Sequence, residues 1–172
     1  LNLEMGAEVL VVAGQHVTAF AGINGPYLTD SNRNGSYADE TPNPNAIGFT
    51  IVNMDFALAL VRPSLGAGLT LPVNFFALQA TADYAGLVGT DPYLTLNAQD
   101  IKLEFNGAIM GSYPIPSLYA DFSKVNGGAG LDIPIGSNAH ALNINYNSNF
   151  LRIGMTANLG VFNLFNLNTS FD

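Results

Sequence analysis

The sequence predicts an all-β fold, and composition is the first reason. Apolar residues make up 48% of the 172 residues, whereas charged residues make up only 10%, well below the usual quarter of a globular protein. The 18 glycines and 9 prolines suit many turns and do not suit a helical bundle. Between those turns, apolar and polar residues alternate with the period of two that is typical of half-buried strands.

The first part of the chain contains apolar stretches separated by turn residues. Residues 3–13 form two short apolar stretches that we expect to end at Gly14. Residues 16–21 then alternate well enough for a half-buried strand, which is closed by Asn24-Gly25 and Pro26.

Three strand–bend–strand units follow, at residues 49–61, 75–88 and 94–105. Asn53 and Asp55 indicate a bend in the first unit, and residues 97–100 indicate one in the third. In the third unit Lys102 and Glu104 share one side of the strand, which predicts one wet face and one buried face.

The C-terminal part begins with a Pro- and Gly-rich stretch, residues 111–136, that predicts a long loop with short strand fragments. Three further strands are predicted at residues 141–146, 150–159 and 164–171.

We expect one β-rich module spanning residues 1–172, because this length suits a single domain or one long repeat unit. Successive strand–bend–strand units favour an elongated, β-solenoid-like stack in which each unit buries its apolar face against the next. A two-sheet antiparallel β-sandwich would produce nearly the same alternation and stays open as the alternative.

Residues 30–41 are the one stretch where acidic and amide side chains meet a glycine without any strand pattern. Asp or Asn at alternate positions, followed by Gly35, resembles the first half of a calcium-binding loop. The oxygen ligands that this pattern predicts for one Ca²⁺ are Asp30, Asn32, Asn34, the carbonyl of Ser36, and Asp39 or Glu40.

The second half of this loop departs from an EF-hand, which needs a bidentate Glu at the twelfth position, where this chain has Thr41. Prolines on both sides leave no room for tightly flanking helices. The alternative is a solvated turn, because Asn, Asp, Gly and Ser are also ordinary turn residues.

Taken in order, several segments resemble a long tandem repeat of very large, adhesin-like bacterial exported and surface proteins. The resembling segments are residues 25–27, 41–48, 53–60, 76–80, 86–89, 94–96, 104–106 and 150–154. The resemblance implies a structural or adhesive role at the cell surface or outside the cell, with a calcium-dependent, Asp-rich loop in each copy. It implies no known catalytic activity. The loop here carries Asn32, Arg33 and Asn34 where the family pattern is richer in Asp.

Charge and cysteine content exclude several classes of function. The net charge of −8, with five scattered basic residues, argues against nucleic-acid binding and fits a calcium-rich exterior. Cysteine is absent, so disulfides, thiolate metal sites and a cysteine nucleophile are excluded. We expect no membrane insertion, because every apolar run is interrupted before it reaches spanning length. The start at Leu1, without a signal-peptide pattern, indicates a processed or excised piece of a longer protein.

We expect no enzymatic activity, because no catalytic constellation is visible. His16 and His140 lack metal-ligand neighbours at a spacing that suits zinc. A glycosidase pair would have to come from Asp83, Asp100 and Glu104, which occupy strand patterns where an outward, solvated carboxylate is the ordinary outcome.

The predicted function is therefore a structural module of an extracellular repeat protein or fibre, stiffened by calcium and joined end to end with like modules. Residues 1–5 and 167–171 would leave open strand edges that invite pairing with a neighbour. The alternative is a carbohydrate-binding adhesin module that uses loop tyrosines such as Tyr27 and Tyr37.

Overall fold

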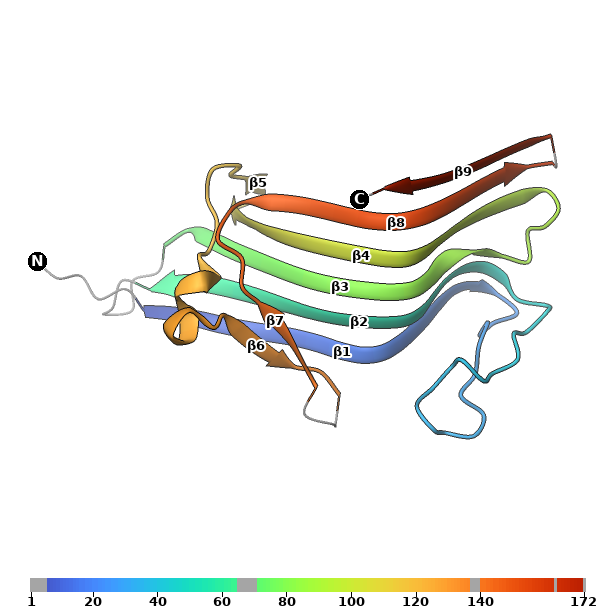
Figure 1. Cartoon of the computed structure of the whole chain (residues 1–172), viewed down its shortest axis with the longest axis horizontal. Coiled ribbons are helices and arrows are strands. Elements are labelled where there is room, and N and C mark those ends of the chain that lie inside the picture. The colour runs from blue at the N-terminus through green and yellow to red at the C-terminus, as the bar shows by residue number, and fades with distance from the viewer. Residues whose placement is uncertain (1–5, 65–70, 137–139, 163, 172) are drawn as a thin grey trace, which may run out of the picture. The chain divides into compact units, whose positions relative to one another are not determined.

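The computed structural model describes residues 6–64, 71–136, 140–162 and 164–171. It is nearly all β, with 63% of residues in strands, so the predicted all-β class is confirmed (Figure 1). The elements in order are β1 (Gly6–Ile23), β2 (Ile47–Ser64), β3 (Val73–Val88), β4 (Leu94–Met110), β5 (Tyr113–Pro114), the 3₁₀ segment η1 (Phe122–Gly128), β6 (Leu131–Pro134), β7 (Ala141–Ile144), β8 (Phe150–Val161) and β9 (Phe165–Phe171). The predicted N-terminal edge at residues 1–5 lies outside the described residues.

The long strands form one antiparallel sheet in the order β1-β2-β3-β4-β8-β9, and β5 adds a short hairpin to β4. Each predicted strand–bend–strand unit is a single long strand. The units lie side by side as antiparallel neighbours and do not form successive coils of a solenoid. The first strand, β1, and the last strand, β9, occupy the two ends of this strand order.

The predicted bends are positions where a strand continues through a left-handed residue. Asn53 in β2 has φ = 55° and Asp100 in β4 has φ = 53°, both in the region that Asn and Asp tolerate best among non-glycine residues. His16 in β1 does the same with φ = 53°. The predicted break at Gly14 is wrong, because β1 runs uninterrupted from Gly6 to Ile23.

The chain forms two compact units, and the long strands contribute to both. Unit 1 comprises Leu1–Ala13, Phe56–Gln79 and Leu103–Arg152, and unit 2 comprises Gly14–Asp55, Ala80–Lys102 and Ile153–Asp172.

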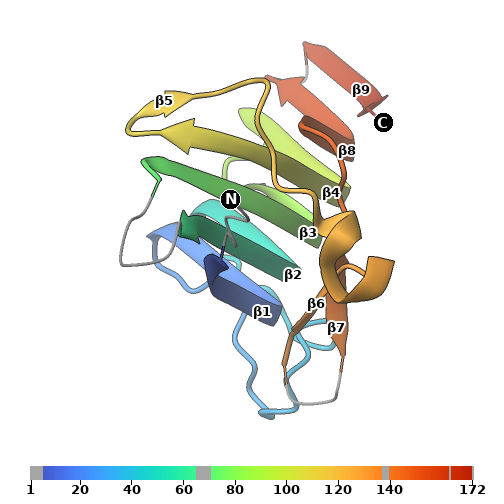
Figure 2. The same ribbon diagram turned by 90° about the vertical axis from the view of Figure 1, so that its left-hand side faces the viewer.

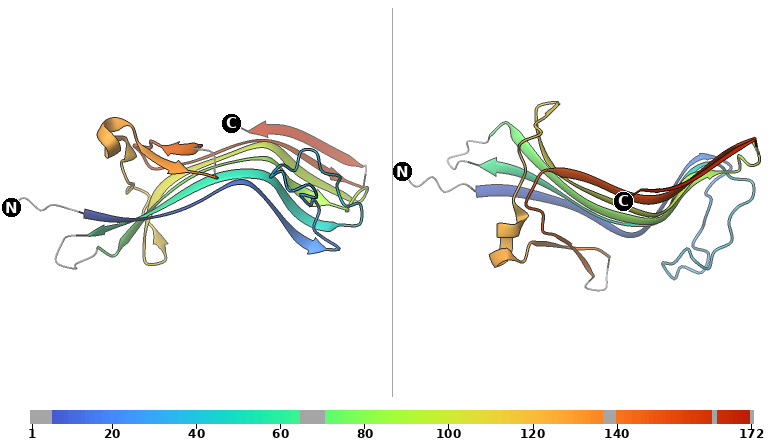
Figure 3. Two further views of the ribbon diagram at one scale, coloured as in Figure 1. Left: turned by 90° about the horizontal axis from the view of Figure 1, so that it is seen from below. Right: turned by 45° about the horizontal axis from the view of Figure 1, so that its top comes forward.

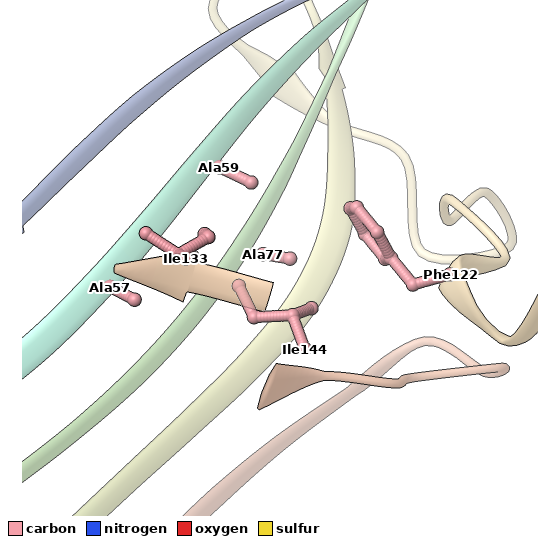
Figure 4. Close-up of a cluster of buried hydrophobic side chains, with 6 residues drawn as sticks. All are labelled: Ala57, Ala59, Ala77, Phe122, Ile133 and Ile144. Carbon is pink, nitrogen blue, oxygen red and sulfur yellow. The ribbon is translucent and has the colours of Figure 1, made fainter. Parts of the chain in front are cut away.

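In unit 1 a small second layer, the cap, covers one face of the strands (Figure 2). It consists of η1 and the antiparallel pair β6–β7, whose register places Leu131 opposite Ile144. Ile133, Ile144 and Phe122 of the cap pack on small side chains of the sheet (Figure 4). The sheet residues at this contact are Ala57, Ala59 and Ala77, all fully buried. The Pro- and Gly-rich stretch 111–136 thus supplies core residues as well as loop.

Unit 2 contains the other halves of the long strands, all of β9, and the connection between β1 and β2. Most of its buried residues are small or polar, with Thr50 fully buried and Ala80, Ala82 and Val88 nearly so. The hydroxyl of Thr50 donates to the carbonyl of Ala19 over 3.1 Å, which ties β2 to β1. The part of the chain that the structure describes has no helix long and apolar enough to span a membrane.

A candidate calcium-type loop in unit 2

Residues 24–46 form a long excursion between β1 and β2 (Figure 3). Asn43 closes its base: its side-chain amide donates to the carbonyls of Asn24 (2.7 Å) and Pro26 (3.2 Å), and its backbone N–H donates to the carbonyl of Tyr27 (2.8 Å). Leu28 and Ala46 are buried beside this closure. These bonds join the two arms of the loop at its base. Residues 30–41 form the outer part of the loop.

The first half of the outer part is built from side chains that accept hydrogen bonds from the backbone N–H groups of residues further along the loop. Asp30 accepts from the N–H of Asn34 with one carboxylate oxygen (3.0 Å) and from that of Gly35 with the other (2.9 Å). Asn32 Oδ1 accepts from the N–H of Asn34 (3.0 Å), and Asn34 Oδ1 from that of Ser36 (2.7 Å). Gly35 makes the sharp turn with φ = 79°. The alternating Asx spacing is thus realised as consecutive tight turns.

The second half folds back onto the first. Asp39 Oδ2 accepts from the side-chain amides of both Asn32 and Asn34, each at 3.0 Å. Asp30, Asn32, Asn34 and Asp39 therefore belong to one connected network, which Ser36 joins through its N–H. Glu40 is held apart from this network, because its carboxylate accepts from the N–H (2.9 Å) and the hydroxyl (2.6 Å) of Ser31.

The electrostatics favour a charged carboxylate at position 39. The amide of Asn32, followed by the backbone N–H of Asp39 itself and then the amide of Asn34, holds the pKa of Asp39 below its usual value of 3.8. The loop carries three carboxylates against the single cation Arg33. It therefore keeps a net negative charge at neutral pH on an exposed surface.

The donor set suits a hard cation in chemical type, because carboxylate, amide and carbonyl oxygens are the ligands that Ca²⁺ takes, six to eight at a time. Among the described residues, no three His, Asp or Glu side chains form a group that could hold a metal ion. A Ca²⁺ site here would need the amide oxygens of Asn32 and Asn34 as well as carboxylates. Adding Glu40 would require its carboxylate to leave Ser31.

The two tyrosines predicted as ligand-binding residues are half-buried. Tyr37 lines a groove of about 370 Å³ in unit 2 together with Phe20, Leu28 and Asp30. The backbone carbonyl of Tyr27 takes part in the closure of the loop, where it accepts from the N–H of Asn43.

A second polar cluster in unit 2 links two residues that the sequence analysis considered separately, His16 for a zinc site and Asp83 for a glycosidase pair. His16 Nδ1 lies 2.7 Å from Asn53 Oδ1, and Asn53 Nδ2 donates to Asp83 Oδ2 over 2.6 Å. The N–H of His16 donates to Asp55 Oδ1 over 2.7 Å. The cluster crosses β1, β2 and β3 at the left-handed residues His16 and Asn53, where it satisfies polar groups that regular pairing would leave open.

In unit 1, the expectation that Glu104 is solvated is wrong. Its side chain is buried and accepts from Nη1 of Arg152 over 2.7 Å, and Arg152 lies on the neighbouring strand β8, where it supplies the opposite charge. Asn106, two residues on, is fully buried and donates to the carbonyls of Ala120 (3.0 Å) and Ser148 (2.9 Å). Sequence reasoning missed Asn106, although its place on the same strand face as Glu104 follows from the strand period.

Comparison with protein-family models, with curated proteins and with solved structures finds no match to this chain.

Proposed function

We propose that the chain is a structural module of an extracellular or cell-surface repeat protein or fibre, stabilised by Ca²⁺ at residues 30–41 and joined end to end with like modules. The observation that carries the calcium part is the single network that links Asp30, Asn32, Asn34 and Asp39. Such a network collects hard oxygens at one place on the loop, before any ion binds. The resemblance to a tandem repeat of surface proteins supports the same proposal.

Calcium would act on this module as a staple between strands. The loop begins after β1 and ends before β2, and Asn43 already closes its base. An ion held by Asp30 from one arm and Asp39 from the other would close the outer part as well. Extracellular calcium is abundant, and the lack of cysteine leaves such an ion as a means of cross-linking that needs no disulfide.

Thermal unfolding in excess Ca²⁺ and in chelator tests this proposal. Free Ca²⁺ at a hundredfold over its Kd is expected to add about 2.7 kcal/mol to the free energy of unfolding. Asp30→Asn keeps the shape of the side chain but removes its charge, so the calcium-dependent shift in Tm should shrink sharply.

The matched control is Glu8→Gln, which removes one carboxylate from an exposed position of β1 in unit 1. This variant should keep the full calcium-dependent shift. An identical Tm for the unaltered chain in Ca²⁺ and in chelator would refute the calcium site.

A second candidate function is carbohydrate recognition, and the groove beside Tyr37 is the observation in its favour. A ring at the edge of a groove can stack on a sugar, and Asp30 can accept sugar hydroxyls. A glycan array probed with the chain in Ca²⁺ should then show hits that Tyr37→Ala abolishes. An array without hits, or with hits that survive Tyr37→Ala, counts against this function.

A further inference from the structure

The two ends of the strand order are formed by the first and last strands of the chain. β1 pairs only with β2, and β9 only with β8, among the strands that the structure describes. In unit 2, residues 14–23 of β1 and residues 165–171 of β9 therefore each have a strand on one side, and no second strand of the described chain lies on the other side.

These edges lack the residues that usually prevent pairing between sheets. Natural edge strands are protected by Lys, by other charged side chains or by Pro. Residues 14–23 and 165–171 contain no Lys, Arg, Asp, Glu or Pro. The chain as a whole has a net charge of −8. Because these two edges carry no charged side chains, they do not repel each other.

The apolar face of β9 lacks a neighbour on its outer side. Phe165, Leu167 and Phe171 lie opposite Val161, Leu159 and Met155 of β8, so they share one face. They are 53%, 46% and 55% exposed, whereas Ala82 and Val88 of the central strand β3 are 8% and 7% exposed. A further strand beside β9 would cover part of this apolar surface.

The strand directions suit one particular neighbour. The order β1-β2-β3-β4-β8-β9 contains five antiparallel steps, so β1 and β9 run in opposite directions. The arrowheads of β8 and β9 show the last of these steps (Figure 1). A copy of β1 placed beside β9 in the same sheet orientation is therefore antiparallel to it, and the alternation continues without interruption.

We propose that β9 of one copy pairs antiparallel with residues 14–23 of β1 of a second copy. This inference rests on the proposed joining of like modules and names the two strands that join. The contact is heterologous, so an assembly has a free β1 edge at one end and a free β9 edge at the other, and further copies can add at both ends. An isologous β9–β9 pair would instead leave both β1 edges uncovered.

Cysteine cross-linking tests the pairing directly, because the chain contains no cysteine of its own. One set of proteins carries Thr169→Cys or Leu167→Cys in β9, and the other carries one cysteine at each position from Gln15 to Ala21 of β1. The two sets are mixed and oxidised, and disulfide-linked pairs are quantified by mass spectrometry. Only Cα atoms within about 7 Å form the bond.

Antiparallel pairing predicts that β9–β1 pairs exceed β9–β9 and β1–β1 pairs. It also predicts that the best β1 partner shifts about two residues toward Ile23 when the β9 cysteine moves from position 169 to 167. A shift in the opposite direction would mean parallel pairing and would overturn the proposal. A majority of β9–β9 pairs, or an absence of pairs, would overturn it too.

Lysine substitution provides an independent measurement on the full chain. Asn168→Lys with Ser170→Lys places two charges on the polar face of the edge strand and should abolish concentration-dependent assembly in sedimentation experiments. The control is Asn158→Lys with Thr156→Lys, which puts the same two charges directly opposite on β8 and should leave assembly at half or more of the unaltered level. Equal losses in both variants would contradict edge pairing.

Both experiments are run in Ca²⁺ and in chelator, which separates this proposal from the calcium site. β9–β1 cross-links that persist while the calcium-dependent shift in Tm is absent would support the pairing and reject the calcium staple. A calcium-dependent shift in Tm without cross-links would do the reverse.

Discussion

Replacing Asn106 by Asp is expected to lower the free energy of unfolding on the order of 3–5 kcal/mol at neutral pH. The side-chain amide of Asn106 is fully buried and donates to the carbonyls of Ala120 and Ser148. An ionised carboxylate cannot donate to either carbonyl, and its charge would stand beside their negative ends. Among the residues that the structure describes, the Oδ1 atom of Asn106 has no hydrogen-bond partner that could stabilise the new charge.

The effect of this substitution should depend on pH in a definite direction. Burial and the two carbonyls favour the protonated form of the introduced carboxyl group, so its pKa in the folded state rises above the unfolded value of about 3.9. A group of that kind contributes full stability below its unfolded pKa and loses it as the pH rises toward and through the folded pKa. The difference from the unaltered chain should therefore be small near pH 4 and large at pH 7.

Urea unfolding at both pH values measures this difference. Asn168→Asp is the control, because it makes the same chemical change at an exposed position of β9 and should cost less than about 0.5 kcal/mol. A loss for Asn106→Asp that is equal at pH 4 and pH 7 would show that the damage is steric and not due to charge.

The strands and their bends could be predicted because the relevant physics is local. Alternation identifies a strand within a few residues, and Asn53 and Asp100 can adopt a left-handed conformation without help from distant groups. The arrangement of the strands is different in kind. Antiparallel neighbours in a meander and successive coils of a solenoid share the same alternation along the chain.

The cap could not be predicted for a related reason. Prolines and glycines in residues 111–136 indicate turns, and they obscure the few apolar residues that reach the core, such as Phe122 and Ile133. The clearest signal for the cap is in the sheet itself. Ala57 and Ala59 lie two residues apart on one face of β2, and small side chains on a strand face allow another layer to approach closely.

In the outer part of the loop, the turns could be predicted from the local sequence, but the position of Glu40 could not. The turns at Asp30, Asn32 and Asn34 follow from short polar side chains that reach backbone N–H groups two to five residues away. The position of Glu40 does not follow from spacing, because a long carboxylate side chain has many possible donors. In the structure its donors are the N–H and hydroxyl of Ser31.

Replacing Ile144 by Ala is expected to lower the free energy of unfolding by about 2–5 kcal/mol. Ile144 of β7 is fully buried against the alanines of β2 and β3 and lies opposite Leu131 of β6. Its removal deletes buried apolar contacts and leaves a cavity. The small side chains Ala57, Ala59 and Ala77 cannot extend to fill that cavity, so the loss should fall in the upper part of the range.

Leu151→Ala is the matched control, because Leu151 also belongs to unit 1 but is 63% exposed on β8. It should change the free energy of unfolding by less than about 0.5 kcal/mol. Urea unfolding followed by circular dichroism measures both variants at a concentration low enough to prevent assembly. If Ile144→Ala costs no more than Leu151→Ala, the cap does not pack on the sheet through Ile144.

Ala77→Leu then tests whether the cap covers the sheet at all. A large side chain beneath a packed cap should cost about 1–3 kcal/mol, whereas on an uncovered strand face it should cost almost nothing.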